Sequence, residues 1–114
     1  MHNPSPPSNS TQLGAAAAAA DAAVAPGSPD RLERLRELIA ANDRASVQLL
    51  NRRLELVAEI WREKDVSGLP HTDPERERRL LQHLEETNEG PLSPAGLAAF
   101  HGALLSLTKQ ELGR

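Results

Sequence analysis

Three cations interrupt an otherwise apolar pattern along the middle of the chain. Arg53 has leucines one helical turn before and after it, Lys64 follows Ile60 by four residues, and Arg36 has similar apolar neighbours. This spacing puts each cation on or beside the apolar face of a helix. A buried cation is costly without a partner, so each needs a carboxylate from the protein or from a ligand. The structural alternatives are internal salt bridges, or aliphatic stems that carry the charge out to water.

The spacing of these cations suits a small dianionic ligand. Arg53 and Lys64 are 11 residues apart, which returns to nearly the same helix face at a separation of ~16 Å along the axis. Arg36 precedes Arg53 by 17 residues, or ~25 Å, and cannot reach the same small ligand within one chain. In an antiparallel dimer, however, the partner's Arg36 could do so.

A second charged group follows, in the run from residue 73 to residue 79. Asp73 and Glu75 are fully explained as acids at the positive end of a helix dipole. Arg76 is not explained in this way, because a helix N-terminus does not favour a cation. The group therefore adds a further candidate binding residue.

The element that carries the first three cations is predicted to be one long helix. Asp30 is a good N-cap, and Glu33 completes a capping box three residues later. Apolar residues then recur at helical spacing, without Gly or Pro, until Gly68. The helix should contain about 35 residues and be ~52 Å long.

Two shorter helices are predicted after it, each of about 15–20 residues. Asp73-Pro74 and Ser93-Pro94 both pair a capping residue with proline at the first helical position. Helices of ~25–30 Å cannot cover a ~52 Å apolar stripe in one chain, and the commonest solution is a twofold homodimer. We therefore expect an all-α fold: a three-helix protomer with one long N-terminal helix, in an intertwined homodimer.

Composition limits the classes of function. The formal net charge of -3 gives no reason to expect a nucleic-acid partner, and no run of about 20 apolar residues is present to span a membrane. The chain has no cysteine, which excludes disulfides and thiol catalysis and permits a cytoplasmic location. The four histidines have no metal-site spacing, so we interpret them as non-ligands.

The chain is predicted to contain one folded domain behind a tail. Residues 1–29 are rich in Pro, Ser and Ala and almost uncharged, which predicts disorder because they cannot bury enough apolar surface. Ala15 to Ala20 is not expected to be a secretory signal, since no Lys or Arg precedes it. Residues 30–114 form the predicted domain.

Taken together, these residues resemble a known family, the chorismate mutases of the all-helical AroQ class. The similarity covers about residues 31–112, and the order and spacing match without a gap from Arg36 to Glu77. The segments that carry it are Leu35-Arg36-Glu37-Leu38-Ile39, Asn42-Asp43, Leu49-Leu50-Asn51-Arg52-Arg53, Glu59-Ile60, Lys64, Asp73-Pro74-Glu75-Arg76-Glu77 and Asn88-Glu89-Gly90-Pro91-Leu92-Ser93-Pro94.

The resemblance implies an isomerase of the shikimate pathway that rearranges chorismate to prephenate, in phenylalanine and tyrosine biosynthesis, without cofactor or metal. It implies an interlocked dimer with two active sites. Arg53 and the partner's Arg36 would each grip a substrate carboxylate, and Lys64 would bind a carboxylate and the ether oxygen. Asp73, Arg76 and Glu77 would line the site, with Glu77 accepting the substrate hydroxyl.

The last helix departs from the family pattern, which has a Ser and, four residues later, a Gln that donates to the ether oxygen. Three registers are open: they pair Thr108 with Leu112, Leu107 with Glu111, or Ser106 with Gln110. We favour Thr108 as a binding residue and Glu111 as the catalytic donor. Glu111 could donate only when protonated, so activity should fall as pH rises.

Two other functions are compatible with the pattern. Relatives of this architecture remove pyruvate from isochorismate to give salicylate, with a similar cationic pocket. A helical dimerisation module without catalysis would explain the long helix, but not the cations at positions 36, 53 and 64. Docking of the domain onto another enzyme of the shikimate pathway is also open.

Overall fold

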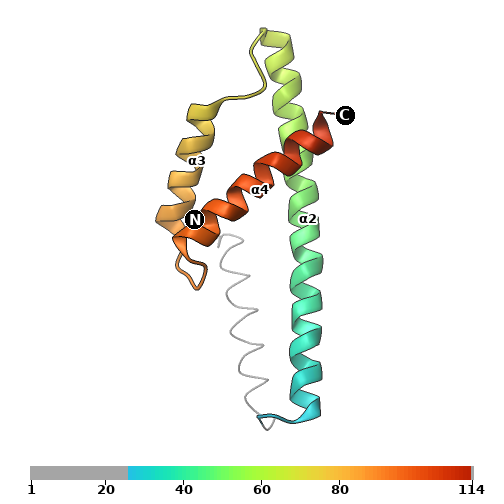
Figure 1. Cartoon of the computed structure of the whole chain (residues 1–114). Coiled ribbons are helices and arrows are strands. Elements are labelled where there is room, and N and C mark those ends of the chain that lie inside the picture. The colour runs from blue at the N-terminus through green and yellow to red at the C-terminus, as the bar shows by residue number, and fades with distance from the viewer. Residues whose placement is uncertain (1–25, 114) are drawn as a thin grey trace, which may run out of the picture. The chain divides into compact units, whose positions relative to one another are not determined.

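The computed structural model describes residues 26–113, and every regular element within that range is a helix (Figure 1). The helices are α2 (Pro29–Ser67), α3 (Pro74–Thr87) and α4 (Pro94–Leu112). The predicted all-α fold with three helices, the first of them long, is therefore confirmed. Most of the predicted disordered tail, residues 1–25, lies outside the described residues.

The N-terminus of α2 differs from the prediction. Ser28, and not Asp30, is the capping residue: its side-chain hydroxyl accepts a hydrogen bond from the Arg31 backbone N–H at 3.0 Å. Pro29 then occupies the first helical position, where its missing N–H costs nothing. The predicted Asp30 cap was wrong, and α2 is 39 residues long, against about 35 predicted.

The C-terminus of α2 lies where the sequence predicts it. Gly68 has a φ of 73°, a left-handed conformation that glycine adopts without steric cost. Its N–H donates to the Asp65 carbonyl oxygen at 3.2 Å, and the Leu69 N–H donates to the Lys64 carbonyl oxygen at 2.8 Å. Together these bonds form a Schellman motif, which satisfies carbonyls that the helix end leaves without partners.

The shorter helices begin at the predicted caps. Asp73 caps α3 and Ser93 caps α4, each with a side-chain oxygen that accepts a backbone N–H three residues later. Proline follows at the first helical position in both cases. The helices contain 14 and 19 residues, so α3 is slightly shorter than predicted.

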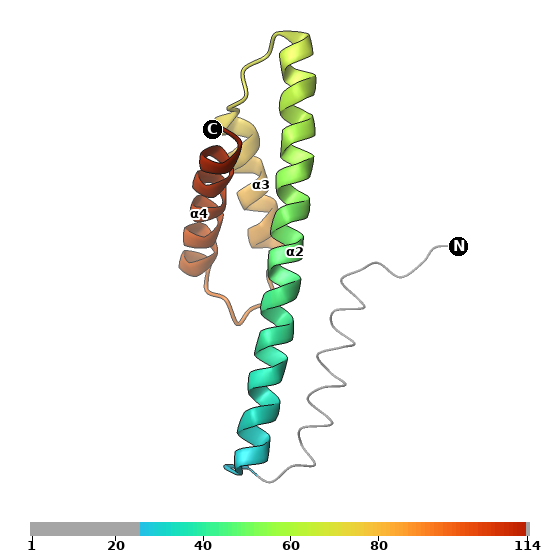
Figure 2. The same cartoon turned by 90° about the vertical axis from the view of Figure 1, so that its right-hand side faces the viewer.

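The chain divides into two parts, residues 1–49 and 50–114. In the second part, α3 and α4 pack against each other (Figure 2). The buried side chains of α4 are Leu97, His101 and Thr108, whereas α2 has no buried residue. Burial within this part therefore centres on α4, and the apolar stripe of α2 is left largely uncovered by its own chain.

Among residues 26–113, no helix combines the length and apolar character that crossing a membrane requires.

Candidate active site

Arg53 is held in place by a residue of the last helix. The Arg53 side chain is half-buried, and its Nη1 donates a hydrogen bond to the Thr108 hydroxyl oxygen at 2.5 Å. That hydroxyl in turn donates to the Leu104 carbonyl oxygen at 2.7 Å. Thr108 is only 5% exposed, so the guanidinium is directed by a rigid, buried acceptor. A guanidinium has five N–H donors, and the others stay available for a carboxylate.

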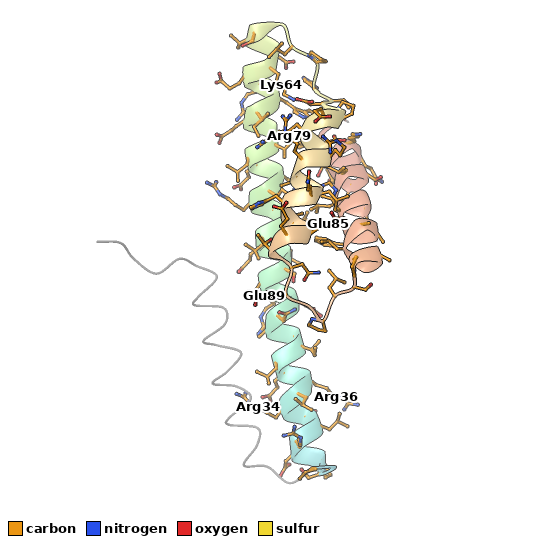
Figure 3. All side chains as sticks on the ribbon, turned by 90° about the vertical axis from the view of Figure 1, so that its left-hand side faces the viewer. Arg34, Arg36, Lys64, Arg79, Glu85 and Glu89 are labelled. Carbon is orange, nitrogen blue, oxygen red and sulfur yellow. The ribbon has the colours of Figure 1, made fainter. Side chains whose placement is uncertain are left out.

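Lys64 is held at the end of α2 by the loop that follows the helix. Its side chain is half-buried, and Nζ donates to the His71 carbonyl oxygen at 3.0 Å. Figure 3 shows Lys64 on the last turns of α2. Because an ammonium group has three donors, this bond leaves two of them for a ligand.

The loop is attached to α2 through the side chain of His71. The imidazole stacks on Trp61, with ring centroids 4.4 Å apart and an angle of 15° between the planes. His71 Nε2 lies 2.6 Å from Asp65 Oδ1. Since a carboxylate only accepts hydrogen bonds, Nε2 carries the hydrogen and donates it.

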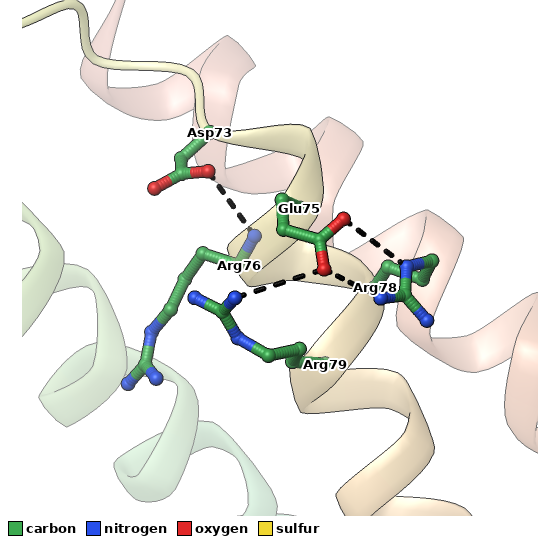
Figure 4. Close-up of polar contacts among 5 residues, drawn as sticks. All are labelled: Asp73, Glu75, Arg76, Arg78 and Arg79. Atoms are coloured by element: carbon green, nitrogen blue, oxygen red, sulfur yellow. Dashed lines mark hydrogen bonds and ion pairs between the residues drawn. The ribbon is translucent and has the colours of Figure 1, made fainter.

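The first turn of α3 presents the next candidate residues. Asp73 Oδ1 accepts the Arg76 backbone N–H at 3.1 Å (Figure 4). The Arg76 side chain is exposed and points away from the Glu75 carboxylate, and Glu77 is half-buried. The carboxylate of Asp73 is therefore partly used as a helix cap, whereas the guanidinium of Arg76 extends away from Glu75 and its partners.

Glu75 and its two arginine partners form a separate group on the exposed surface of α3. Arg78 binds the Glu75 carboxylate through two nitrogens, at 3.3 and 2.5 Å, and Arg79 lies 3.6 Å from it (Figure 4). The hydrogen bond and the charge of Arg78 lower the pKa of Glu75 below its ordinary value of 4.5 and raise the pKa of Arg78. These charges satisfy one another, which fits the surface role that the sequence assigned to Glu75.

The candidate residues of α4 differ in how far they are buried. Thr108 is buried and Glu111, less than one turn later, is half-buried, whereas Ser106 and Gln110 are exposed. Glu111 also has a polar interaction within the chain. The burial of Thr108 and Glu111 is compatible with their selection as site residues, which stays a prediction, whereas Ser106 and Gln110 face solvent in the single chain.

Arg36 lies in the other part of the chain, residues 1–49, and its side chain is exposed (Figure 3). The structure therefore groups Arg53 with Thr108, and Lys64 with the loop before Asp73. Sequence reasoning missed His71, Trp61 and Asp65 as supports of Lys64. Their spacing had no recognisable signal, because the contacts depend on the path of the loop.

The described residues do not gather three or more His, Asp or Glu side chains into a group that could hold a metal ion. Arg53 and Lys64 are therefore the candidate groups for binding a ligand at this site. A half-buried guanidinium and a half-buried ammonium with donors to spare can bind carboxylates and stabilise negative charge.

Comparison with known proteins identifies the family. The sequence profile of the family described as chorismate mutase type II matches residues 35–111. Two solved structures of chorismate mutase from Thermus thermophilus are similar to this chain. Form I is 32% identical with a TM-score of 0.67, over 68% of this chain and 98% of the other. Form II is 31% identical with a TM-score of 0.70, over 74% and 96%.

None of the curated proteins compared is significantly similar to the chain. The family profile covers well over half of the sequence, and the chain belongs to the chorismate mutase type II family. The resemblance stated from the sequence is confirmed.

Proposed function

We propose that this chain is a chorismate mutase, an isomerase that rearranges chorismate to prephenate. The observation that carries the proposal is the pair of half-buried cations, Arg53 and Lys64, inside the matched segment 35–111. Each is fixed by a hydrogen bond to a neighbouring element and keeps donors free. Two such cations suit a substrate that carries two carboxylates.

The reaction is an intramolecular pericyclic shift, which needs no nucleophile or redox centre. The enzyme must hold a flexible dianion in its reactive conformation and stabilise the negative charge that grows on the ether oxygen. Arg53 binds a carboxylate through its planar fork. Lys64 supplies a compact charge to a carboxylate and to the ether oxygen.

The remaining residues surround the same substrate. Asp73, Arg76 and Glu77 line the site from the first turn of α3, and Glu77 accepts the substrate hydroxyl. Thr108 orients Arg53 and contributes to binding. The observations support two of these roles: Glu77 is half-buried, and Thr108 touches the guanidinium directly.

The site is completed by a second copy of the chain in an intertwined homodimer. Large apolar side chains along α2 are exposed in the single chain, among them Leu35 at 39%, Ile39 at 61%, Leu56 at 42% and Ile60 at 51%. A stripe of this length is typical of a surface that a partner covers. In this dimer, the partner's Arg36 binds the second carboxylate.

Glu111 is the proposed second partner of the ether oxygen. A carboxyl group donates a hydrogen bond only when it is protonated, so we predict that kcat/KM falls as pH rises out of the acid range. Glu111→Gln should flatten this profile, because an amide donates at every pH. A wild-type profile that stays flat to about pH 9 would remove Glu111 from this role.

Incubation of the purified full chain with chorismate tests the proposed function. Chorismate absorbance should decline, and prephenate should be the product. A parallel incubation with isochorismate controls for the lyase reaction, whose products would be salicylate and pyruvate. Salicylate without prephenate would replace the mutase by the lyase. A folded dimer that acts on neither substrate would leave only a dimerisation module.

We further propose that residues 30–114 form the catalytic domain and that the enzyme works in the cytoplasm. The matched segment 35–111 supports the first statement. A variant that lacks residues 1–25, and so keeps the Ser28 cap of α2, should keep the wild-type kcat/KM, and cell fractionation would test the location. Docking onto another enzyme of the pathway stays a prediction.

A further inference from the structure

His71 is one of the histidines that the proposed reaction leaves without a role, yet its ring and its backbone carbonyl both contact α2. The loop between α2 and α3, residues 68–73, is exposed along its whole length. Three contacts hold its middle, and each involves His71: the ring stack on Trp61, the bond to Asp65, and the bond from Lys64.

These contacts connect a side chain to a backbone position. The His71 ring is fixed on the surface of α2 by Trp61 and Asp65, which lie one turn apart on that helix. Fixing the ring fixes the peptide that follows, whose carbonyl oxygen accepts from Lys64 Nζ at 3.0 Å. An exposed loop without such an attachment opens easily and carries its carbonyls with it.

From this arrangement we propose that His71 is a positioning residue for Lys64, acting through its own backbone carbonyl, with Trp61 and Asp65 as its supports. The inference rests on the proposed function, in which Lys64 contacts the substrate. His71 itself does not touch the substrate. It sets where the Lys64 ammonium lies before chorismate arrives, so that the ammonium meets the ether oxygen without rearrangement.

A positioning role for His71 can be distinguished from a structural role by comparing the effects of a substitution on stability and on rate. The side chains of His71 and Asp65 are 38% and 64% exposed, and polar contacts this exposed contribute little to global stability. Small errors in the position of a catalytic group, in contrast, lower the rate strongly. His71→Ala should therefore affect the reaction much more than the melting temperature.

The first measurement compares steady-state kinetics of full-length variants with chorismate. His71→Ala should lower kcat/KM about tenfold, mostly through kcat, because Lys64 acts on charge that develops in the transition state. Asp65→Ala should have a similar effect, and Asp65→Asn, which keeps the accepting oxygen, should restore most of the activity. His83→Ala, at another exposed histidine on α3, is the matched control and should match the wild type.

The second measurement reports the position of Lys64 without using the reaction. The chain has two lysines, Lys64 and Lys109, and Lys109 is exposed. Trace acetylation followed by mass spectrometry gives the ratio of their labelling rates in the same sample. His71→Ala should raise the Lys64 to Lys109 ratio about threefold, because a freed ammonium is more accessible, and His83→Ala should leave the ratio unchanged.

The outcomes separate the two proposals. If the wild type turns over chorismate but His71→Ala keeps its kcat/KM, or keeps its labelling ratio, the positioning role is wrong and the proposed function stands. The role is also wrong if His71→Ala lowers activity only in parallel with a lower melting temperature, and if Asp65→Asn is as inactive as Asp65→Ala. A wild type without turnover overturns both.

Discussion

Thr108 shows how one small polar side chain directs a long cationic one. The sequence predicts that Arg53 lies on an apolar face and needs a partner, because helical spacing defines the face on which a residue lies. It does not predict the partner, since spacing says nothing about which helix covers that face. The contact between Arg53 and Thr108 joins residues 55 positions apart, and only the fold brings them together.

Replacement of Thr108 tests this contact. Thr108→Val keeps the shape of the side chain but removes the hydroxyl that accepts from Arg53 Nη1. Hydrogen bonds to charged groups contribute about 1.5–3 kcal/mol, so kcat/KM with chorismate should fall by about one to two orders of magnitude. Thr108→Ser should stay near the wild type, and Thr87→Val at the exposed end of α3 is the control. Full activity in Thr108→Val would show that Arg53 does not depend on this bond.

The carboxylate of Glu75 gives a prediction about pH. Its pKa is lowered, first by the hydrogen bond from Arg78 and then by the charge of that residue. A lowered folded-state pKa stabilises the fold above the unfolded pKa, and this contribution is lost as pH falls through the folded pKa. NMR titration should place the Glu75 pKa below 4.5 and move it upward in Arg78→Gln. An unchanged titration in that variant would contradict the pairing.

Three helices of this chain begin with the same arrangement, a capping Ser or Asp followed by Pro. The prediction used it correctly at Asp73-Pro74 and Ser93-Pro94 but overlooked Ser28-Pro29. Asp30 and Glu33 fit a capping box, whereas Ser28 and Pro29 fit the rule of a capping residue followed by proline, so the local signals conflict. The difference of two residues does not change the face on which Arg36, Arg53 and Lys64 lie, because the helix phase comes from the apolar pattern.

A pair of glycine substitutions tests whether Gly68 ends α2 in a left-handed conformation. Gly68→Ala forces a side chain into a left-handed conformation with a φ of 73°, and should lower the free energy of unfolding by about 1 kcal/mol. Gly102→Ala, in the interior of α4 with open space around the added carbon, should raise it by about 1 kcal/mol. Urea unfolding of both variants measures the two effects, and a stabilised Gly68→Ala would contradict the Schellman motif.

At the scale of the whole molecule, the sequence predicted the helices of residues 26–113, the family and the uncovered stripe of α2. It could not predict how the loop after α2 reaches back to Lys64, because loop paths depend on tertiary contacts such as the Trp61 and His71 stack. The stripe is exposed in the single chain, since α2 has no buried residue within the described part of the chain. A second copy is the simplest way to cover it and to supply a cation as well.

Mixing two inactive variants tests most directly whether two chains close around one substrate. Arg36→Ala and Arg53→Ala should each be nearly inactive with chorismate. After the two are unfolded and refolded together in equal amounts, half of the dimers are mixed, and each mixed dimer has one intact site of two. Activity should recover to about a quarter of the wild-type value.

The control is each variant refolded alone, which should stay inactive. Recovery to about a quarter would show that Arg36 and Arg53 of different subunits serve the same substrate molecule. A mixture as inactive as its components, although native mass spectrometry of chains with tags of different mass shows mixed dimers, would contradict the shared active site.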